Sequence, residues 1–147
     1  MYDLATGAAR PASGYRLPTA AEWSHAAGLP SKDTAHLGPA QTKETGPLVE
    51  WVRTAAPKPV GSLRANDRGL FDMHGNVWEW VQDWYDGTYY SSSPANNPSG
   101  PETGKYRVYR GGSYIGKATN LRSAVRFSAL PTTRTHDVGF RLVRQLE

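Results

Sequence analysis

Serine, histidine and aspartate side chains that could act together lie in the last third of the chain. Ser113 and Ser123 are candidate nucleophiles, and His136 with Asp137 could supply a base and a group that orients it. Neither serine lies in a Gly-x-Ser-x-Gly elbow, the strained turn that exposes the nucleophile of many hydrolases. The sequence therefore favours structural roles for these side chains over a hydrolytic one.

Redox and metal chemistry is limited by the side chains that the chain lacks. None of its 147 residues is cysteine, which excludes disulfides, thiolate metal sites and cysteine nucleophiles. Its histidines include no pair at metal-ligand spacing, so an iron site is not expected; they are His25, His36, His74 and His136.

Length and composition indicate one domain that is rich in turns. At 147 residues with 38% hydrophobic side chains, the chain can bury a single core. It holds 15 glycines and 11 prolines, and stretches that favour helix are scarce, so long loops are expected. No apolar run approaches the roughly 18 residues that a membrane-spanning helix needs.

Charge is unevenly distributed along the chain. The formal net charge is +4, but residues 1–102 carry −3 and residues 103–147 carry +7. Nucleic-acid binding through the basic third is one interpretation. The other is that its arginines pair with acids of the N-terminal part and hold loops in place. We favour the second interpretation and expect structural roles for Arg107, Arg110, Arg122 and Arg141, with Lys117, Arg126 and Arg134 exposed.

The clearest helix is predicted to begin after Thr19 and to stop at Gly28. Thr19 and Glu22 have capping-box spacing, and Gly28 and Pro30 end the helical pattern. Residues 29–47 are predicted to form a surface loop, 48–52 a short strand or turn, and 57–62 an extended segment leading into a loop at 64–68.

Further along, alternating side chains predict strands. Residues 77–81 alternate as in a buried aromatic strand, and residues 106–110 and 138–143 are predicted strands separated by loops. The connection at 86–104 is long and irregular. The tryptophans of this framework, which does not include Trp51, are expected in the core; they are Trp23, Trp78, Trp80 and Trp84.

Five motifs in order resemble the formylglycine-generating-enzyme, or sulfatase-modifying-factor, family. They are YRLPTAAEW at 15–23, GLFDMHGNVWEW at 69–80, RVYRGGSY at 107–114, LRSA at 121–124 and VGFRL at 138–142. The resemblance implies an α+β, C-type-lectin-like fold with little regular secondary structure. We expect a single domain over residues 1–145 that is short for the family before Arg16, followed by a cloning scar at Leu146 and Glu147.

Two enzymatic branches of this family are not expected here. The oxidases bind copper through a pair of cysteine thiolates near the segment that matches 121–124, with Ser123 at the second position in this chain. A hydroxyl cannot replace a soft thiolate for Cu(I), so oxidase activity and copper are excluded. The sulfoxide synthases of ergothioneine biosynthesis take their iron ligands from a separate helical domain, which this chain lacks.

A third branch comprises the variable proteins of diversity-generating retroelements, which display a ligand-binding surface near the C-terminus. This chain resembles them in layout, which implies a non-catalytic domain that recognises a protein or other macromolecule through loops at 114–137. Tyr114, Ile115, Val125, Phe127, Leu130 and His136 are predicted to be exposed and to supply contact area. The remaining predicted ligand-binding residues are Gly116, Lys117, Thr119, Asn120, Ser128, Ala129, Thr132, Thr133, Thr135 and Asp137.

The resemblance also implies a structural Ca²⁺ site. Its ligands would be the side chains of Asp72 and Glu79 and the carbonyls of Gly75 and Val77. The alternative is that both carboxylates bond backbone groups or pair with an arginine.

The competing hypothesis is that the chain is part of a longer sulfatase-modifying-factor-like enzyme. Neither a nucleic-acid partner nor a membrane span is expected. No apolar segment of the secretory kind follows Met1, so a complete chain would be cytoplasmic.

Overall fold

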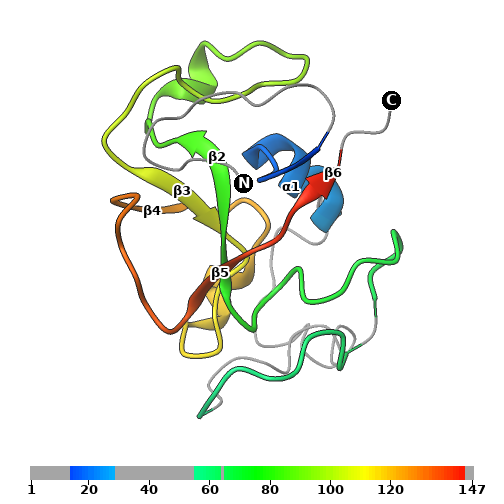
Figure 1. The fold of residues 1–147 in the computed structure, drawn as a ribbon. Coiled ribbons are helices and arrows are strands. Elements are labelled where there is room, and N and C mark those ends of the chain that lie inside the picture. Colours follow the sequence, from blue (N-terminus) through cyan, green and yellow to red (C-terminus); the bar gives the residue numbers. More distant parts are fainter. Residues whose placement is uncertain (1–13, 29–54, 64, 145–147) are drawn as a thin grey trace.

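The computed structural model describes residues 14–28, 55–63 and 65–144. The loop predicted at 29–47, the strand or turn at 48–52 and Trp51 lie outside these residues. In chain order the elements are β1 (Tyr15–Arg16), α1 (Ala20–Ala27), β2 (Trp78–Trp84), the 3₁₀ turn η3 (Tyr89–Ser91), β3 (Arg107–Arg110), the 3₁₀ turn η4 (Ala118–Leu121), β4 (Phe127–Ala129), β5 (Val138–Phe140) and β6 (Val143–Arg144). Short elements joined by long loops confirm the predicted α+β class (Figure 1).

Helix α1 begins where the capping box predicted. Thr19 accepts a hydrogen bond from the Glu22 amide at 3.1 Å, and the Glu22 carboxylate accepts one from the Thr19 amide at 2.8 Å. These bonds satisfy amides that the first helical turn leaves free. Gly28, with φ of 81°, ends the helix as predicted.

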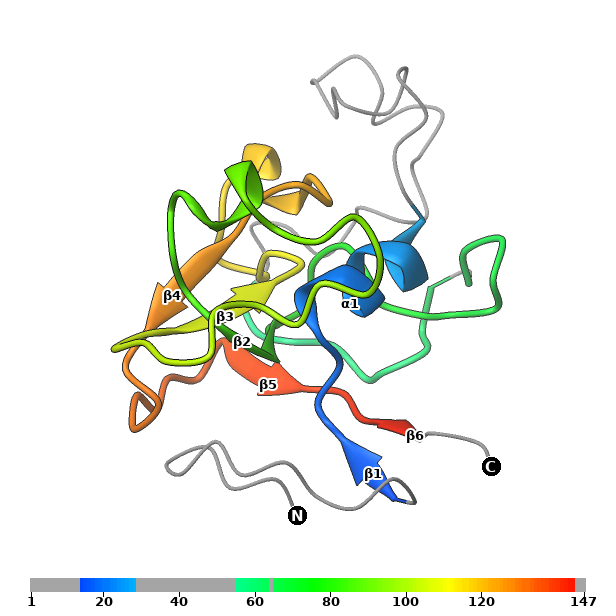
Figure 2. The ribbon, with the colours of Figure 1, turned by 90° about the horizontal axis from the view of Figure 1, so that it is seen from above.

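Two sheets organise the described residues. The larger has the order β4-β3-β2-β5, in which β2 and β3, and β3 and β4, are antiparallel while β2 and β5 are parallel. Strands β1 and β6 pair separately and bring the two described ends together, as Figure 2 shows. Strand β2 is therefore central, which agrees with its nearly continuous burial.

The alternation predicted for β2 divides its side chains between two buried faces. Val81 lies on the face covered by α1, in a core cluster with Ala20, Trp23, Ala27, Met73 and Val108. Trp78 and Trp80 lie on the opposite face, where each makes an edge contact with the Tyr109 ring at 5.2 Å between centroids. Trp23, Trp78 and Trp80 are buried, as predicted, whereas Trp84 is only partly so.

The structure corrects the prediction of one strand at 138–143. This segment forms β5 in the large sheet and β6 in the small one. Arg141 lies between them, and its guanidinium bonds Glu79 and the Phe71 carbonyl. The chain thus changes its pairing partner from β2 to β1, which alternation in a sequence cannot reveal.

The loops agree with the sequence predictions more closely than the C-terminal strands do. The connection between β2 and β3 is irregular except for η3 and forms the upper end of the molecule in Figure 1. Residues 57–59 have no regular structure and lead into a turn at 60–61. Within the described parts of the chain, no helix has the length and hydropathy required to cross a bilayer.

Candidate functional site

Buried arginines connect the framework beneath the candidate surface. The Arg110 guanidinium donates to the Ser24 hydroxyl of α1 and to the Ser123 carbonyl, and it lies 5.2 Å from the centre of the Trp23 ring. Burial lowers the pKa of Arg110. This contact joins helix, sheet and the segment after η4, which confirms the structural role predicted for Arg110.

Two further framework arginines behave as predicted, and one does not. Arg107 is buried, lies over the Trp84 ring at 3.5 Å and donates to the Gln82 carbonyl. Arg141 is bonded to Glu79. Arg122, in contrast, is exposed and donates at 3.1 Å to the Thr119 carbonyl of its own turn.

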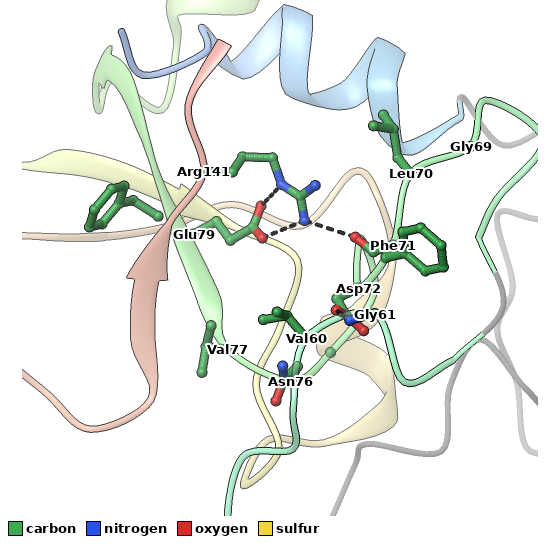
Figure 3. Close-up of a pocket in the computed structure, with 12 residues that line it drawn as sticks. Val60, Gly61, Gly69, Leu70, Phe71, Asp72, Asn76, Val77, Glu79 and Arg141 are labelled. Atoms are coloured by element: carbon green, nitrogen blue, oxygen red, sulfur yellow. Dashed lines mark hydrogen bonds and ion pairs between the residues drawn. The ribbon is translucent and has the colours of Figure 1, made fainter. Parts of the chain in front are cut away.

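The Glu79 carboxylate is buried and accepts three hydrogen bonds. Its Oε2 accepts from Trp23 Nε1 at 2.7 Å and from Arg141 Nε at 2.6 Å, while Oε1 accepts from Arg141 Nη2 at 2.6 Å (Figure 3). Such a two-pronged ion pair satisfies both carboxylate oxygens and neutralises the charge. The alternative role, pairing with an arginine, is therefore present at Glu79.

Asp72 lies in a strained turn a few residues earlier. Asp72 and Asn76 have positive φ angles of 57° and 64°, which L-residues rarely adopt. Asp72 Oδ2 accepts from the Gly61 amide at 2.7 Å, but Oδ1 is buried and has no hydrogen-bond partner among the described residues. An orphaned carboxylate oxygen of this kind is suited to a cation or to an additional donor.

A cavity of about 410 Å³ joins these two carboxylates. Leu70, Phe71 and Val77 supply apolar lining, and Asp72, Glu79 and Arg141 contribute polar groups (Figure 3). Gly75 also lines the cavity. The four predicted Ca²⁺ ligands thus all lie along one cavity. Asp72 fits a hard cation, whereas Glu79 fits it poorly because Arg141 already neutralises its charge.

Some of the predicted recognition residues lie in strand β4 at the edge of the sheet, and the others lie outside the strands. Ile115, Leu130 and His136 are exposed, and Val125 is partly exposed. Lys117, Thr119, Thr132, Arg134 and Thr135 are exposed as well, and Gly116, Asn120 and Thr133 are partly so. Residues 127–129 were expected in a loop but form β4, which pairs with β3, although Phe127 keeps 42% of its surface exposed.

Tyr114 is buried, which corrects the prediction that it is exposed. It retains only 5% of its accessible surface, and its amide donates to the Asn76 carbonyl at 2.8 Å. Its ring lies 6.3 Å from that of His136. Tyr114 therefore fixes the start of the segment and is not available for contact with a ligand.

Ser113 and Ser123, the candidate nucleophiles, have structural roles in the fold. The Ser113 hydroxyl is buried and donates to Asp137 Oδ2 at 3.0 Å. Asp137 also accepts from the Trp78 amide through its carbonyl at 2.8 Å. Ser123 is buried as well, with its carbonyl bonded to Arg110. These bonds hold both ends of the 114–137 segment to the framework, as the sequence favoured.

The sequence interpretation missed one group of side chains near this segment. The Arg126 guanidinium, which is only half-buried, lies 4.3 Å from the centre of the Tyr90 ring and 5.3 Å from that of Tyr85. Its Nη2 donates at 3.4 Å to the Asp86 carbonyl. The tyrosine-rich start of the long loop after β2 was the available signal. Folding adds this loop to the surroundings of the predicted surface.

Proteins similar to this chain in sequence include enzymes of two kinds. The sulfatase-modifying factor enzyme 1-like domain matches residues 2–146. A formylglycine-generating enzyme of Streptomyces coelicolor is 40% identical over 161 residues, covering 95% of this chain and 49% of the enzyme. The serine/threonine-protein kinase pkn1 of Chlamydia pneumoniae is 39% identical over 139 residues, covering 90% of this chain and 21% of the kinase.

Solved structures give the same relationship. Treponema denticola variable protein 1 superimposes with a TM-score of 0.74 at 32% identity, covering 91% of this chain and 49% of that protein. PvdO from Pseudomonas aeruginosa has a TM-score of 0.68 at 26% identity, covering 91% of this chain and 54% of that one. This chain thus spans about half the length of each structure and half or less of each curated relative. The C-type-lectin-like, variable-protein layout is confirmed, and the chain belongs to the family of sulfatase-modifying factor enzyme 1-like domains.

Proposed function

We propose that this chain is a non-catalytic ligand-binding domain of the variable-protein kind found with diversity-generating retroelements. One observation carries the proposal. Side chains of unrelated types are exposed in the 114–137 segment, while the framework residues at its two ends are held by hydrogen bonds. Ile115, Leu130 and His136 extend from the segment, whereas Ser113 and Asp137 anchor its two ends. The similarity to a variable protein supports it.

The framework can support such a surface because its stability is supplied elsewhere. Leu121 is fully buried between the exposed Thr119 and Arg122, and Arg110 bonds the Ser123 carbonyl from below. Substitutions at solvent-exposed positions usually change stability little. Binding specificity could then change at these positions without loss of the fold.

A randomised library tests the proposal. Codons for Ile115, Lys117, Thr132, Arg134 and His136 would be randomised, and the library displayed on phage and selected against hen egg-white lysozyme as an arbitrary target. We expect most unselected variants to fold and selection to return binders. A control library at Leu121, Ser123 and Val108, which are buried, should consist mostly of unfolded proteins. Equal loss of folding in both libraries would refute the proposal.

Natural variation offers an independent test. Sequencing the gene in many isolates should reveal substitutions concentrated in codons 115–136, a neighbouring reverse-transcriptase gene and an adenine-rich template repeat. Uniform variation along the gene and no such repeat would exclude a retroelement origin, while the library experiment would still judge ligand binding.

The competing function is that of an enzyme part, and the identity with formylglycine-generating enzymes favours it. We propose that this chain has no formylglycine-generating activity, because it supplies no thiolate for Cu(I). Incubation with copper and a cysteine-containing sulfatase-motif peptide should yield no aldehyde by mass spectrometry. The Streptomyces coelicolor enzyme is the positive control, and aldehyde formation by this chain would contradict the assignment.

We also propose that Asp72 and the carbonyls of Gly75 and Val77 hold a structural Ca²⁺, with Glu79 as the weakest contributor. The orphaned Asp72 Oδ1 and the shared cavity support this site. Calorimetric titration with Ca²⁺ should show binding that Asp72→Asn weakens at least tenfold. Asp67→Asn, at an exposed neighbouring turn, should leave binding unchanged. If neither Ca²⁺ nor a chelator alters the heat signal or the melting temperature, the site is absent.

A further inference from the structure

An arginine flanked by two tyrosines lies where the long loop after β2 meets the start of β4. The Arg126 guanidinium lies 4.3 Å from the centre of the Tyr90 ring and 5.3 Å from that of Tyr85. Both tyrosines remain accessible, Tyr90 with 51% and Tyr85 with 39% of its surface exposed. In Figure 2, η3, η4 and the chain between η4 and β4 lie on the same side of the molecule. The three side chains thus form an accessible group at the border of the 115–136 surface.

Most N–H donors of the Arg126 guanidinium have no hydrogen-bond partner among the described residues. Nη2 donates to the Asp86 carbonyl over 3.4 Å, which is long for a hydrogen bond. The neighbouring carboxylates have other partners: Asp86 Oδ1 accepts from the amide and the hydroxyl of Thr88, and the buried Asp83 accepts from the Ala20 amide. Arg126 makes no ion pair with a described carboxylate, so its planar donors are available to an external acceptor.

The loop that presents the tyrosines is held by its own hydrogen bonds. The Tyr89 hydroxyl accepts from the Gly100 amide at 3.2 Å, which joins η3 to the far part of the same connection. The bonds between Asp86 and Thr88 fix the residue that precedes η3. A guanidinium that already contacts two rings on such a loop loses little freedom when it pairs with a carboxylate.

The charge of the surface indicates the chemistry of its ligand. Residues 114–137 hold four basic side chains and one carboxylate, a formal net charge of +3. The carboxylate, Asp137, is already bonded to the framework. Lys117, Arg122 and Arg134 are exposed and make no ion pair with a described carboxylate. A partner with acidic side chains complements this surface.

A protein fits the Arg126 group better than a nucleic acid does. Arginine and tyrosine are among the residue types that contribute most to binding between proteins. The exposed Asp86 carboxylate lies on the same loop and opposes the continuous negative charge of a phosphate backbone more than it opposes a single carboxylate.

We propose that Arg126, between Tyr85 and Tyr90, binds a carboxylate of an acidic protein ligand. The guanidinium donates paired N–H groups to an aspartate or glutamate, and the two rings shield this ion pair from water. None of the three residues belongs to the ligand-binding set predicted from the sequence. The inference rests on the proposed function, because it names the chemistry of the ligand at the same surface.

Chemically modified forms of one protein test the proposal. Hen egg-white lysozyme would be either acetylated, which removes the charge of its lysines, or succinylated, which places a carboxylate on each of them. Both forms would be immobilised for surface plasmon resonance. We expect this chain to bind the succinylated form about tenfold more tightly than the acetylated form. If the two forms bind equally, or if neither binds, the proposal is wrong.

Matched variants separate the Arg126 site from attraction by net charge. Arg126→Gln should weaken binding to the succinylated form about tenfold by removing charged donors. Arg126→Lys should weaken it as well, because lysine keeps the charge but lacks the planar fork. Arg144→Gln removes an exposed arginine 6.0 Å from the Tyr15 ring and should change binding less than about twofold. Thermal melts establish that each variant is folded. Equal losses from Arg126→Gln and Arg144→Gln would overturn the proposal.

A fluorescein-labelled oligothymidine tests the other kind of polyanion. If it binds more tightly than succinylated lysozyme and Arg126→Gln abolishes that binding, a nucleic acid is the occupant and the proposal is wrong.

The library experiment judges the proposed function separately. If library members selected against succinylated lysozyme keep their affinity with Arg126→Gln, ligand binding at 115–136 stands and the Arg126 site is wrong. If both libraries lose folding equally, the proposed function fails, while the resonance measurements on the parent protein and its variants still decide whether Arg126 binds carboxylates.

Discussion

The cavity region around Glu79 and the surface at 115–136 differ in how their polar groups are used. Both oxygens of Glu79 accept hydrogen bonds, and its partners come from α1 and from the segment between β5 and β6. In the surface segment, Lys117, Thr119 and Arg134 are exposed side chains. Similar residue types thus hold the fold together in one region and remain accessible in the other, and the difference should appear in mutant stabilities.

The largest effect is expected where the ion pair of Glu79 is broken. Arg141→Met leaves the Glu79 carboxylate buried without its cation, which should cost about 3 kcal/mol of unfolding free energy. Urea unfolding followed by tryptophan fluorescence measures this loss. Arg144→Met, an exposed cation beside the Tyr15 ring, should cost less than about 0.5 kcal/mol. Equal costs would show that the Glu79 pair contributes no more than a surface contact.

A smaller but clear effect is expected where the framework meets the surface. Gly112 has a φ of 81°, and a Cβ there would lie 2.5 Å from Leu121 Cδ2. Gly112→Ala should destabilise the protein by about 2 kcal/mol through strain and steric overlap. Gly69 has a similar φ of 73°, but an added Cβ there would meet no atom within 4 Å. Gly69→Ala therefore measures the cost of backbone strain without the steric overlap. If the two variants lose the same stability, the Leu121 contact is unimportant.

Two carboxylates at the start of α1 should respond to pH in opposite directions. The hydrogen-bonded Arg16 guanidinium lowers the pKa of Glu22, while burial raises the pKa of Asp83, whose Oδ2 accepts from the Ala20 amide. Glu22 therefore stabilises the fold above its ordinary pKa and loses that contribution as pH falls. Asp83 contributes most below its ordinary pKa and loses the contribution as pH rises through its folded value.

Stability measurements between pH 3 and pH 7 check these signs. Glu22→Gln should lower the unfolding free energy by about 0.5 kcal/mol at pH 7, because the Arg16–Glu22 pair is partly exposed. Near pH 3 the substitution should have no measurable effect on stability. For Asp83→Asn, stability relative to the parent protein should increase as pH rises. The same pH trend in both variants would contradict the assigned causes.

The smallest effect per substituted residue is expected at the recognition surface. Ile115→Ser, Lys117→Ser and Arg134→Ser, combined in one protein, should change the unfolding free energy by less than about 1 kcal/mol, because each position is exposed. Thermal melts followed by circular dichroism measure the change. A loss comparable to that of Arg141→Met would place these residues in the framework and remove the difference between the two regions.

Much of the framework follows from local sequence patterns. The capping box of Thr19 and Glu22 and the terminal Gly28 determine helix α1, because their hydrogen bonds and backbone angles involve near neighbours. Alternation around Val81 determines that β2 is a strand, and the absence of cysteine excludes thiolate chemistry without any structure.

Only the tertiary structure decided which partner each side chain has. Arg122 and Arg141 look alike in the motifs, but only Arg141 meets a buried carboxylate, 62 residues away in the chain. Tyr114 is buried because its backbone bonds Asn76, and the segment at 138–143 divides because its two halves pair with strands from different parts of the chain. Contacts between residues far apart in sequence leave no local period, so the cavity that Asp72, Glu79 and Arg141 line emerges only when the chain is folded.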